Sequence, residues 1–328
     1  MVKPPKDAVI PRRMMTISIY AVSWLLLTLL SPLWIPLGIL VGAARRKSFI
    51  LLRLLLFGWF YLGFELIALV LIAGVFAFQK GAARDEALYG LQAWWASVNL
   101  RVAARLLRLD VTVEGAEQAI PGPTILLIRH ASILDTLLPC VFIQRPYRFR
   151  VRYVLKQELL FDPCIDVVGN ALPNYFVDRT GNTPKELAGL RELVSDLGTD
   201  GVLIFPEGTR FSERKRETAL QKLEAAGSPM SQEARALTRV LPPKPGGVLT
   251  LLDALPNVDC VIFAHTGLET FAKIKDLLSG AVVGSSVRIR LWRIPSHEIP
   301  EGNNRRLRWL YEEWAKVDAF VRDEGVLS

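Results

Sequence analysis

The sequence predicts an α/β domain, in which a layered sheet is flanked by helices, behind an N-terminal helical membrane anchor. Two observations support this class. The apolar residues concentrate in two long stretches before residue 80, and short β-branched segments alternate with helical ones after residue 110. The composition fits both halves, because 51% hydrophobic residues argue against a purely soluble protein and 22% charged residues argue against a polytopic transporter.

The anchor, residues 1–80, contains apolar stretches at residues 14–44 and 48–78, each longer than the roughly 20 residues that cross hydrocarbon. Basic clusters precede the first stretch and separate it from the second, and such clusters tend to stay on the cytoplasmic side. Two prolines interrupt the first stretch. Two topologies are therefore open: a re-entrant hairpin that turns at residues 31–36, or two spanning helices joined by a basic loop.

A connecting helix is predicted over residues 81–110, where apolar residues recur at helical spacing. Arg101, Arg105 and Arg108 form a second stripe on this helix. The pattern fits a helix that lies in the headgroup layer of a membrane, and it fits equally well a core helix with a solvated basic face.

The main domain is predicted over residues 111–328. Segments rich in β-branched residues predict strands at residues 124–128, 148–155, 175–177, 202–205, 260–264 and 287–292. Helical spacing predicts helices at residues 183–197, 213–226 and 305–321. A charge-dense insertion at residues 211–239 is either a surface helix or a mobile flap.

The formal net charge of +8 is unevenly distributed. Residues 1–47 carry +6, residues 48–79 are neutral, and residues 80–328 carry only +2. The basic charge therefore lies mostly at the flanks of the membrane segments, where it favours anionic lipid headgroups. A nucleic-acid partner is not expected.

Metal and disulfide chemistry have little support. Cys140, Cys164 and Cys260 are scattered and form no C-x-x-C pair. His265 and Glu269 have the i,i+4 spacing of two ligands on a helix, but no third ligand accompanies them. We therefore expect neither a metal site nor a disulfide scaffold.

A His-Asp pair follows the first core strand of this domain. The apolar segment at residues 124–128 runs into Arg129-His130-Ala131-Ser132-Ile133-Leu134-Asp135. If His130 ends the strand and Ser132 caps a helix whose third residue is Asp135, the carboxylate can accept a hydrogen bond from one ring nitrogen of His130. The other nitrogen would then be free to act as a base.

A second signal is the segment Gly201 to Arg210, in which a buried strand enters a Pro-Glu-Gly turn. Gly208 permits close approach of the backbone, and the planar guanidinium of Arg210 suits a phosphate group.

These two blocks, RHASILDT at residues 129–136 and FPEGTR at residues 205–210, resemble the lysophospholipid (1-acylglycerol-3-phosphate) acyltransferase family of glycerolipid acyltransferases. Two further blocks are similar to family motifs. One is KQELL at residues 156–160, with Pro163, Gly169 and FVDR at residues 176–179, and the other is LPPKPGG at residues 241–247. The chain differs from many relatives at Arg129, where they carry Asn, and at residues 258–262, which lack a proline. It resembles a divergent bacterial-type branch.

The resemblance implies a membrane-bound enzyme that moves an acyl group from acyl-CoA or acyl-carrier protein to the hydroxyl of a lysophospholipid. The implied acceptor is 1-acylglycerol-3-phosphate, which gives phosphatidic acid. His130 would deprotonate the hydroxyl and Asp135 would orient the imidazole. The implied phosphate-binding residues are Glu207, Gly208, Thr209, Arg210, Arg179 and Lys156. No permanently bound cofactor is implied.

Two alternatives remain open. The first is an enzyme of the same family with another acceptor, such as glycerol-3-phosphate, a different lysophospholipid or an aminolipid. The second is a non-catalytic membrane protein that binds anionic lipid through its basic flanks. In each case the chain is expected in a membrane, and the bacterial-type resemblance points to the inner membrane with the main domain facing the cytoplasm.

Overall fold

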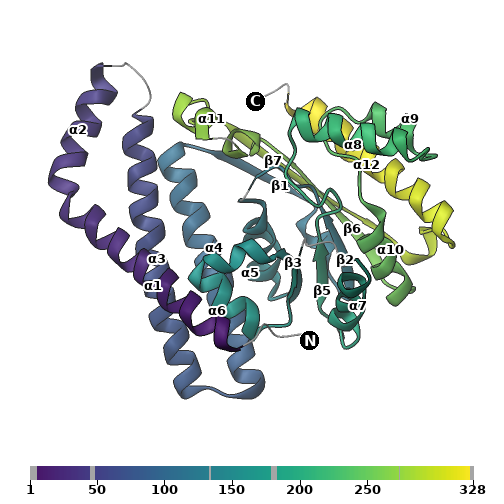
Figure 1. Cartoon of the computed structure of the whole chain (residues 1–328), viewed down its shortest axis with the longest axis horizontal. Helices are drawn as coiled ribbons and strands as arrows, with labels where there is room; N and C mark the ends of the chain where they lie inside the picture. Colours follow the sequence, from purple (N-terminus) through teal and green to yellow (C-terminus); the bar gives the residue numbers. More distant parts are fainter. Residues whose placement is uncertain (1–5, 45–48, 133, 179–182, 273, 326–328) are drawn as a thin grey trace.

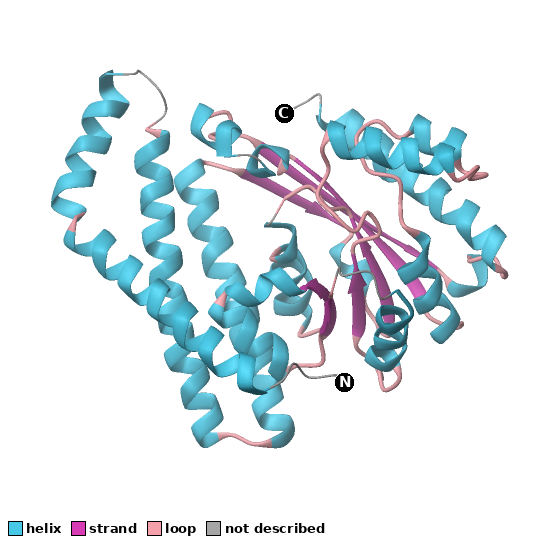
Figure 2. Cartoon of the chain, viewed as in Figure 1, coloured by secondary structure: helices cyan, strands magenta, loops and turns pink. Residues whose placement is uncertain are grey.

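The computed structural model describes residues 6–44, 49–132, 134–178, 183–272 and 274–325. Within these residues, seven strands form one sheet in the order β1-β7-β6-β2-β5-β3-β4. Figure 2 draws the strands in magenta among the cyan helices. The strands are β1 (Asp110–Glu114), β2 (Thr124–Ile128), β3 (Val151–Lys156), β4 (Tyr175–Val177), β5 (Gly201–Ile204), β6 (Asp259–Thr266) and β7 (Ser286–Ile294). From β6 to β4 all neighbours are parallel, whereas β7 is antiparallel to β6 and parallel to β1.

Strand β2 lies at the centre of the sheet and is buried on both faces. Ile125 and Leu127 contribute to one core, and Leu126 and Ile128 contribute to the other, because successive side chains of a strand point to opposite sides. Helices cover both faces, which confirms the predicted layered α/β class.

The two helical layers come from different parts of the chain. The first core packs against α7 (Thr183–Val194), α10 (Pro245–Ala254) and α12 (Asn303–Gly325), and the second packs against α4 (Gly81–Leu107) and α6 (Pro163–Ala171). Shorter helices lie around this frame: α5 (Arg145–Tyr147), α9 (Ser231–Ala236) and α11 (Ile274–Ser279).

The predicted strands are present, with shifted ends. Strand β3 begins at Val151 rather than at residue 148, because Arg148 has a left-handed φ of 51° that a strand cannot include. Strand β1, which was not predicted, lies at the edge of the sheet, where its side chains are exposed or half-buried in alternation.

The N-terminal segment forms three helices, α1 (Lys6–Leu29), α2 (Ser31–Ala44) and α3 (Ile50–Phe78), which stand beside the sheet domain (Figure 1). Within the described part of the chain, α3 is long and apolar enough to cross a membrane, and the α1–α2 pair qualifies as one broken span or a re-entrant loop. Helices α1 and α2 meet at 68°. The bend lies at Leu30, and residues 31–36 are helical because Pro32 occupies the first turn of α2, where its missing N–H costs nothing. The choice between the two topologies stays a prediction.

Ion pairs join the anchor helices to the sheet domain. Arg12 Nε lies 3.0 Å from Asp166 Oδ2, and Arg13 lies 3.1 Å from the other carboxylate oxygen of this buried residue of α6. On α3, the Tyr61 hydroxyl donates a hydrogen bond to Asp162, the N-cap residue of α6. The anchor is therefore docked on the same helix that closes the second core.

Helix α4 fits the second alternative predicted for it, a core helix with a basic face on the outside, whereas a position in the headgroup layer stays a prediction. Leu88, Trp95 and Leu100 are buried in the second core, whereas Arg101 and Arg105 are exposed. The charged insertion contains α8 (Glu213–Ala225), none of whose residues is buried. Arg216 of this surface helix donates hydrogen bonds to the Leu237 and Arg235 carbonyl groups, at 2.5 and 2.9 Å.

Candidate active site

The candidate site lies at the carboxyl edge of the parallel strands. The segments that follow β2 and β5, together with the ends of β3 and β6, meet there, because β2 has β5 and β6 as neighbours and β3 lies beyond β5. Open α/β sheets bind ligands at this edge. The topology thus brings together motifs that are separated by more than a hundred residues.

His130 and Asp135 are in direct contact. His130 Nδ1 lies 3.0 Å from Asp135 Oδ2, so the contact predicted from their spacing is present. Strand β2 ends at Ile128, and a 3-10 turn over residues 134–136 takes the place of the predicted capped helix. The turn is tight enough to bring Asp135 back to the end of the strand.

Asp135 is fully buried, and its acceptor capacity is well used. Its Oδ2 also accepts hydrogen bonds from the main-chain N–H groups of Ala131 at 2.6 Å and Ser132 at 2.8 Å. Its Oδ1 accepts one from the Ser132 hydroxyl at 2.8 Å. A carboxylate held by this many donors is fixed in place, and it fixes the imidazole that donates to it.

The charges of the pair follow from this environment. Burial lowers the pKa of His130 below its usual value, and Lys156 lowers it further, while the contact with Asp135 acts in the opposite direction. Burial alone would raise the pKa of Asp135, but His265, His130 and the Ser132 N–H outweigh it and the pKa is lowered. Near neutral pH the pair is a neutral imidazole beside a carboxylate.

Lys156, at the end of β3, faces the other ring nitrogen. Its Nζ lies 3.3 Å from His130 Nε2. With Nδ1 donating to Asp135, Nε2 is the acceptor nitrogen of the neutral ring and is available to a proton donor. The candidate catalytic nitrogen therefore lies beside the ammonium group of Lys156.

Glu207 is buried and points into the protein. One of its carboxylate oxygens accepts a hydrogen bond from the His130 N–H at 2.8 Å, and the other accepts one from the Leu241 N–H at 2.9 Å. Burial raises its pKa to about 7. Glu207 thus ties the loop after β2 to the chain that precedes α10.

The turn after β5 presents small and basic groups. Gly208 has a φ of +65°, a left-handed conformation that suits glycine. Lys215 Nζ donates to the Thr209 hydroxyl and to the Arg210 carbonyl, both at 3.0 Å. Among the described residues, none forms a hydrogen bond or an ion pair with the guanidinium of Arg210 that would keep it from a ligand.

The structure adds Lys244 to this turn. A Cβ atom at Gly208 would lie 3.3 Å from Lys244 Nζ, so the ammonium group lies directly over the glycine. The Lys244 N–H donates to the Pro206 carbonyl at 2.8 Å, which joins the two segments. The sequence signal was present in the LPPKPGG block, although no role was assigned to its lysine. Arg179, the remaining predicted residue, lies outside the described residues.

His265 and Glu269 also belong to this region. The two residues do not share one helix as their spacing suggests. His265 is the penultimate residue of β6, with Nε2 3.6 Å from Asp135 Oδ1, and Glu269 lies after the strand and forms an ion pair with the buried Arg129. In the part of the chain that the structure describes, no group of three or more His, Cys, Asp or Glu side chains is arranged to hold a metal ion.

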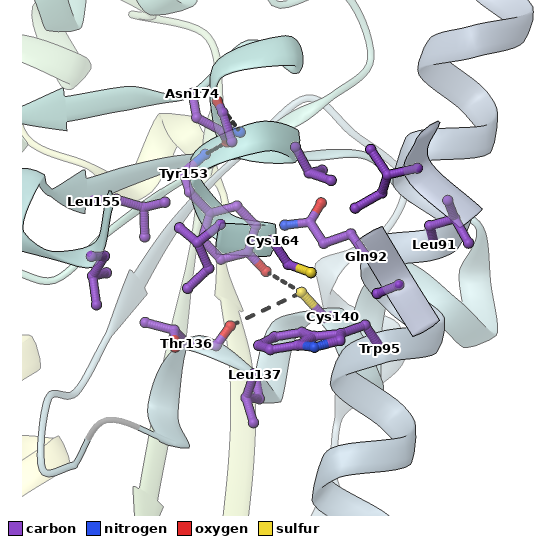
Figure 3. A pocket seen from close by; sticks show the side chains of 16 residues that line it. Leu91, Gln92, Trp95, Thr136, Leu137, Cys140, Tyr153, Leu155, Cys164 and Asn174 are labelled. Atoms are coloured by element: carbon purple, nitrogen blue, oxygen red, sulfur yellow. Dashed lines mark hydrogen bonds between the residues drawn. The ribbon is translucent and has the colours of Figure 1, made fainter. Parts of the chain in front are cut away.

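An apolar cavity lies between the anchor helices and the sheet (Figure 3). Thr136 and Leu137, which directly follow Asp135, line it together with Leu155, which directly precedes Lys156. Its opposite wall comes from α4, through Gln92 and Trp95, and from α3 and α6. Three lining residues are thus close in sequence to Asp135 and Lys156, but neither of these residues nor His130 lines the cavity itself.

Comparisons with known proteins find acyltransferases among the similar sequences. A family model described as Acyltransferase matches residues 110–265. The 1-acyl-sn-glycerol-3-phosphate acyltransferase delta of Bos taurus is 31% identical over 123 residues, which are 37% of this chain and 31% of that protein. The Homo sapiens protein of the same name is 32% identical over 123 residues, so the chain spans about a third of the length of these relatives. The 1-acyl-sn-glycerol-3-phosphate acyltransferase 3 of Arabidopsis thaliana is 26% identical over 238 residues, which are 69% of this chain and 58% of that protein.

The fold is similar to a solved structure as well. The crystal structure of the 1-acyl-sn-glycerophosphate (LPA) acyltransferase from Thermotoga maritima matches 83% of this chain and 96% of its own length, with a TM-score of 0.54 and 18% identity. The matched residues 110–265 include His130, Asp135 and the FPEGTR turn. Residues 110–265 therefore match an acyltransferase domain, and the chain is similar to proteins named 1-acyl-sn-glycerol-3-phosphate acyltransferase.

Proposed function

We propose that this protein is a membrane-bound O-acyltransferase that moves a fatty acyl group from an acyl thioester to the hydroxyl of a lysophospholipid. The favoured acceptor is 1-acylglycerol-3-phosphate, which would give phosphatidic acid. One observation carries the proposal: His130 is held through Nδ1 by a buried carboxylate and keeps Nε2 as its acceptor nitrogen, at the edge of the sheet where ligands bind.

The proposed reaction is a direct transfer. The acceptor O–H bond breaks and its proton moves to His130 Nε2, while the oxygen forms a bond to the thioester carbonyl carbon. The resulting tetrahedral oxyanion collapses, the C–S bond breaks, and the thiolate leaves with the proton returned by His130. Asp135 stabilises the transient imidazolium and keeps the ring in the productive orientation.

Lys156 is placed to act on this reaction electrostatically. A cation 3.3 Å from Nε2 is close to the atom where the reacting oxygen must lie. It can stabilise the negative charge of the tetrahedral intermediate or attract the acceptor phosphate. Because it also disfavours protonation of His130, it keeps the base in its neutral form.

The acceptor phosphate is proposed to bind over the turn after β5. Arg210 supplies the planar fork, Lys244 supplies an ammonium group over Gly208, and Thr209 supplies a hydroxyl. Glu207 takes a different part, since its buried carboxylate accepts two main-chain hydrogen bonds and would repel a phosphate. We assign it to positioning the loop that carries His130.

The acyl chain is proposed to occupy the apolar cavity beside the His-Asp pair. Its walls are mostly aliphatic and aromatic, and Leu137 and Leu155 among them lie within two residues of Asp135 and Lys156 in the sequence. Its free volume of about 60 Å³ holds only part of a fatty chain, so the walls would have to open around the rest. A fatty chain there would place its thioester close to His130. The anchor contributes to this cavity through Ala68 and Ile72 of α3.

The exposed apolar surface of α1, α2 and α3 is proposed to lie in the membrane, at the bacterial inner membrane with the sheet domain in the cytoplasm. Arg101 and Arg105 of α4 are exposed beside these helices and would meet anionic headgroups. This arrangement would give the site access to lipid acceptors without their passage through water.

The test is product analysis by mass spectrometry. The purified protein in mixed phospholipid vesicles receives a mixture of lysolipids and glycerol-3-phosphate, with isotope-labelled acyl-CoA or acyl-carrier protein as donor. We expect labelled phosphatidic acid as the main product. Label in another lipid would reassign the acceptor, whereas no labelled lipid from either donor would refute acyl transfer and leave a lipid-binding protein.

A further inference from the structure

The residue before the catalytic histidine makes contacts that the proposed reaction does not use. Arg129 is 1% exposed, which is rare for an arginine. Its guanidinium donates to the His265 carbonyl at 2.7 Å, to the Arg239 carbonyl at 3.0 Å and to the Glu269 carboxylate. The Arg129 side chain thus contacts His265, Arg239 and Glu269 rather than the candidate catalytic groups.

His265 returns the contact. Its Nε2 lies 2.9 Å from the Arg129 carbonyl oxygen. A carbonyl oxygen can only accept, so Nε2 carries the hydrogen. Its Nδ1 is buried and has no partner among the described residues, so a second proton there would be unpaired. His265 is therefore the neutral tautomer with its hydrogen on Nε2, and that N–H group also lies 3.6 Å from Asp135 Oδ1.

These contacts are reciprocal across two neighbouring strands. Ile128 of β2 pairs with Phe263 of β6, and the ladder continues with a hydrogen bond from the Arg129 N–H to the Phe263 carbonyl at 3.2 Å. Beyond that bond, the Arg129 side chain holds the main chain of His265, and the His265 side chain holds the main chain of Arg129. The two strand ends are locked immediately before the chain turns into His130.

We propose that Arg129, His265 and Glu269 form a positioning cluster. The buried Arg129 and His265 fix the strand end that carries His130, and the half-exposed Glu269 forms an ion pair with Arg129. None of the three touches the reacting atoms. The cluster sets the place from which His130 and Asp135 act, and a misplacement of about 1 Å costs roughly 100-fold in rate. The inference rests on the proposed base role of His130.

Glu269 has a separate part in this cluster. The charged or titratable groups that face His130 are Asp135, Lys156 and His265, and Arg129 and Glu207 lie behind them. Without the Glu269 carboxylate, the Arg129 guanidinium would lose its ion-pair partner, and Glu207 would remain as the other carboxylate that interacts with its charge. An added cation behind His130 disfavours its protonated form.

The chain offers a matched control. Arg152 is also buried, and its guanidinium also holds two main-chain carbonyl groups, those of Leu193 and Asp196, and two carboxylates. It lies near the start of β3, at the opposite end of that strand from Lys156. Arg152→Gln therefore removes a buried guanidinium with similar hydrogen bonds, at the end of β3 opposite to Lys156.

The experiment compares Arg129→Gln with Arg152→Gln by Tm, and by kcat and KM for lysolipid acylation. We expect similar losses of Tm, a kcat reduced at least about tenfold in Arg129→Gln alone, and an acceptor KM unchanged in both. The proposal would be overturned if Arg129→Gln and Arg152→Gln, at similar Tm, had the same kcat. Acylation by the unmodified protein is measured first, so its absence would count against the proposed function and not against the cluster.

Two milder sets of variants keep the proposal testable if Arg129→Gln fails to fold. His265→Gln retains an N–H donor for the Arg129 carbonyl group and is therefore expected to have a higher kcat than His265→Leu. A kcat no higher than that of His265→Leu would contradict the proposed role of His265 in the positioning cluster. Glu269→Gln is expected to move the acid limb of kcat/KM to lower pH, because it leaves a cation behind His130. An acid limb that does not move would refute the neutralising role of Glu269.

Discussion

The edge of the sheet around His130 and the outer face of the anchor helices differ in how far the protein itself covers and contacts their side chains. At the sheet edge, Asp135 is 0% exposed and accepts hydrogen bonds from four groups of its own loop. On α2, Leu33 and Leu37 are 69% and 59% exposed, and no described side chain covers them. The first region is satisfied by contacts within the protein, whereas the second leaves apolar side chains exposed, as expected for the membrane attachment proposed above.

This difference suggests that catalysis and membrane attachment can be altered separately. Changes at the sheet edge act on groups that are fixed by internal hydrogen bonds, and changes on α2 act on a surface that touches little of the sheet domain. Variants of the two regions should therefore give opposite patterns of activity and fractionation.

The largest effect is expected for His130→Ala. Removal of the base should lower acyl transfer by about 10²–10⁴-fold, while the share of protein in the membrane fraction stays the same. Activity is followed by labelled product and fractionation by immunoblot. His297→Ala, a substitution of an exposed histidine far along the chain, serves as the control and should retain full activity. Turnover at the normal rate in His130→Ala would eliminate the proposed mechanism.

Arg210→Ala should act on the acceptor alone. Loss of a charge-assisted contact to phosphate costs about 1.5–3 kcal/mol, which corresponds to roughly a 10–100-fold increase in acceptor KM. The KM for the thioester should change little, and steady-state kinetics with each substrate varied in turn measures both. Arg214→Ala on the exposed α8 is the matched control. A parallel rise of both KM values would argue against a phosphate role for Arg210.

Leu37→Asn should have the reverse pattern. The substitution removes apolar surface from the exposed face of α2, and a loss of about 1.5 kcal/mol of burial in lipid reduces vesicle partitioning roughly tenfold. Flotation with vesicles measures the bound fraction, and kcat in detergent should be unchanged. Leu278→Asn replaces a leucine of similar exposure on α11, outside the anchor, and should float normally. Unchanged flotation of Leu37→Asn would exclude this face from the membrane.

The His-Asp contact could be predicted from the sequence because it is local. Five residues separate the two side chains, and turn chemistry with Ser132 brings them together. The core strands could be predicted for the same reason, since their apolar segments are continuous.

The surroundings of the pair could not be predicted, because they depend on sheet order. His265 is 135 residues after His130, and it becomes a neighbour only because β6 pairs with β2. Glu207 looked like a phosphate-binding residue within its motif, yet its carboxylate turns inward to two main-chain N–H groups. The edge strand β1 was missed because a half-exposed strand has a weak apolar pattern.

The smallest predicted effect concerns pH. His130 must be neutral to act as a base, and its pKa is lowered from 6.5, first by burial and also by Lys156. The activity should therefore rise with pH through a midpoint below 6.5 and be complete at neutral pH. Lys156→Met removes one cause of the lowered pKa, so the acid limb of kcat/KM should move to higher pH, whereas Lys156→Arg, which keeps the charge, should leave it in place. Measured over pH 5–8, an acid limb that stays in place in Lys156→Met would mean that this ammonium group does not act on His130, and a move to lower pH would contradict the sign of its effect.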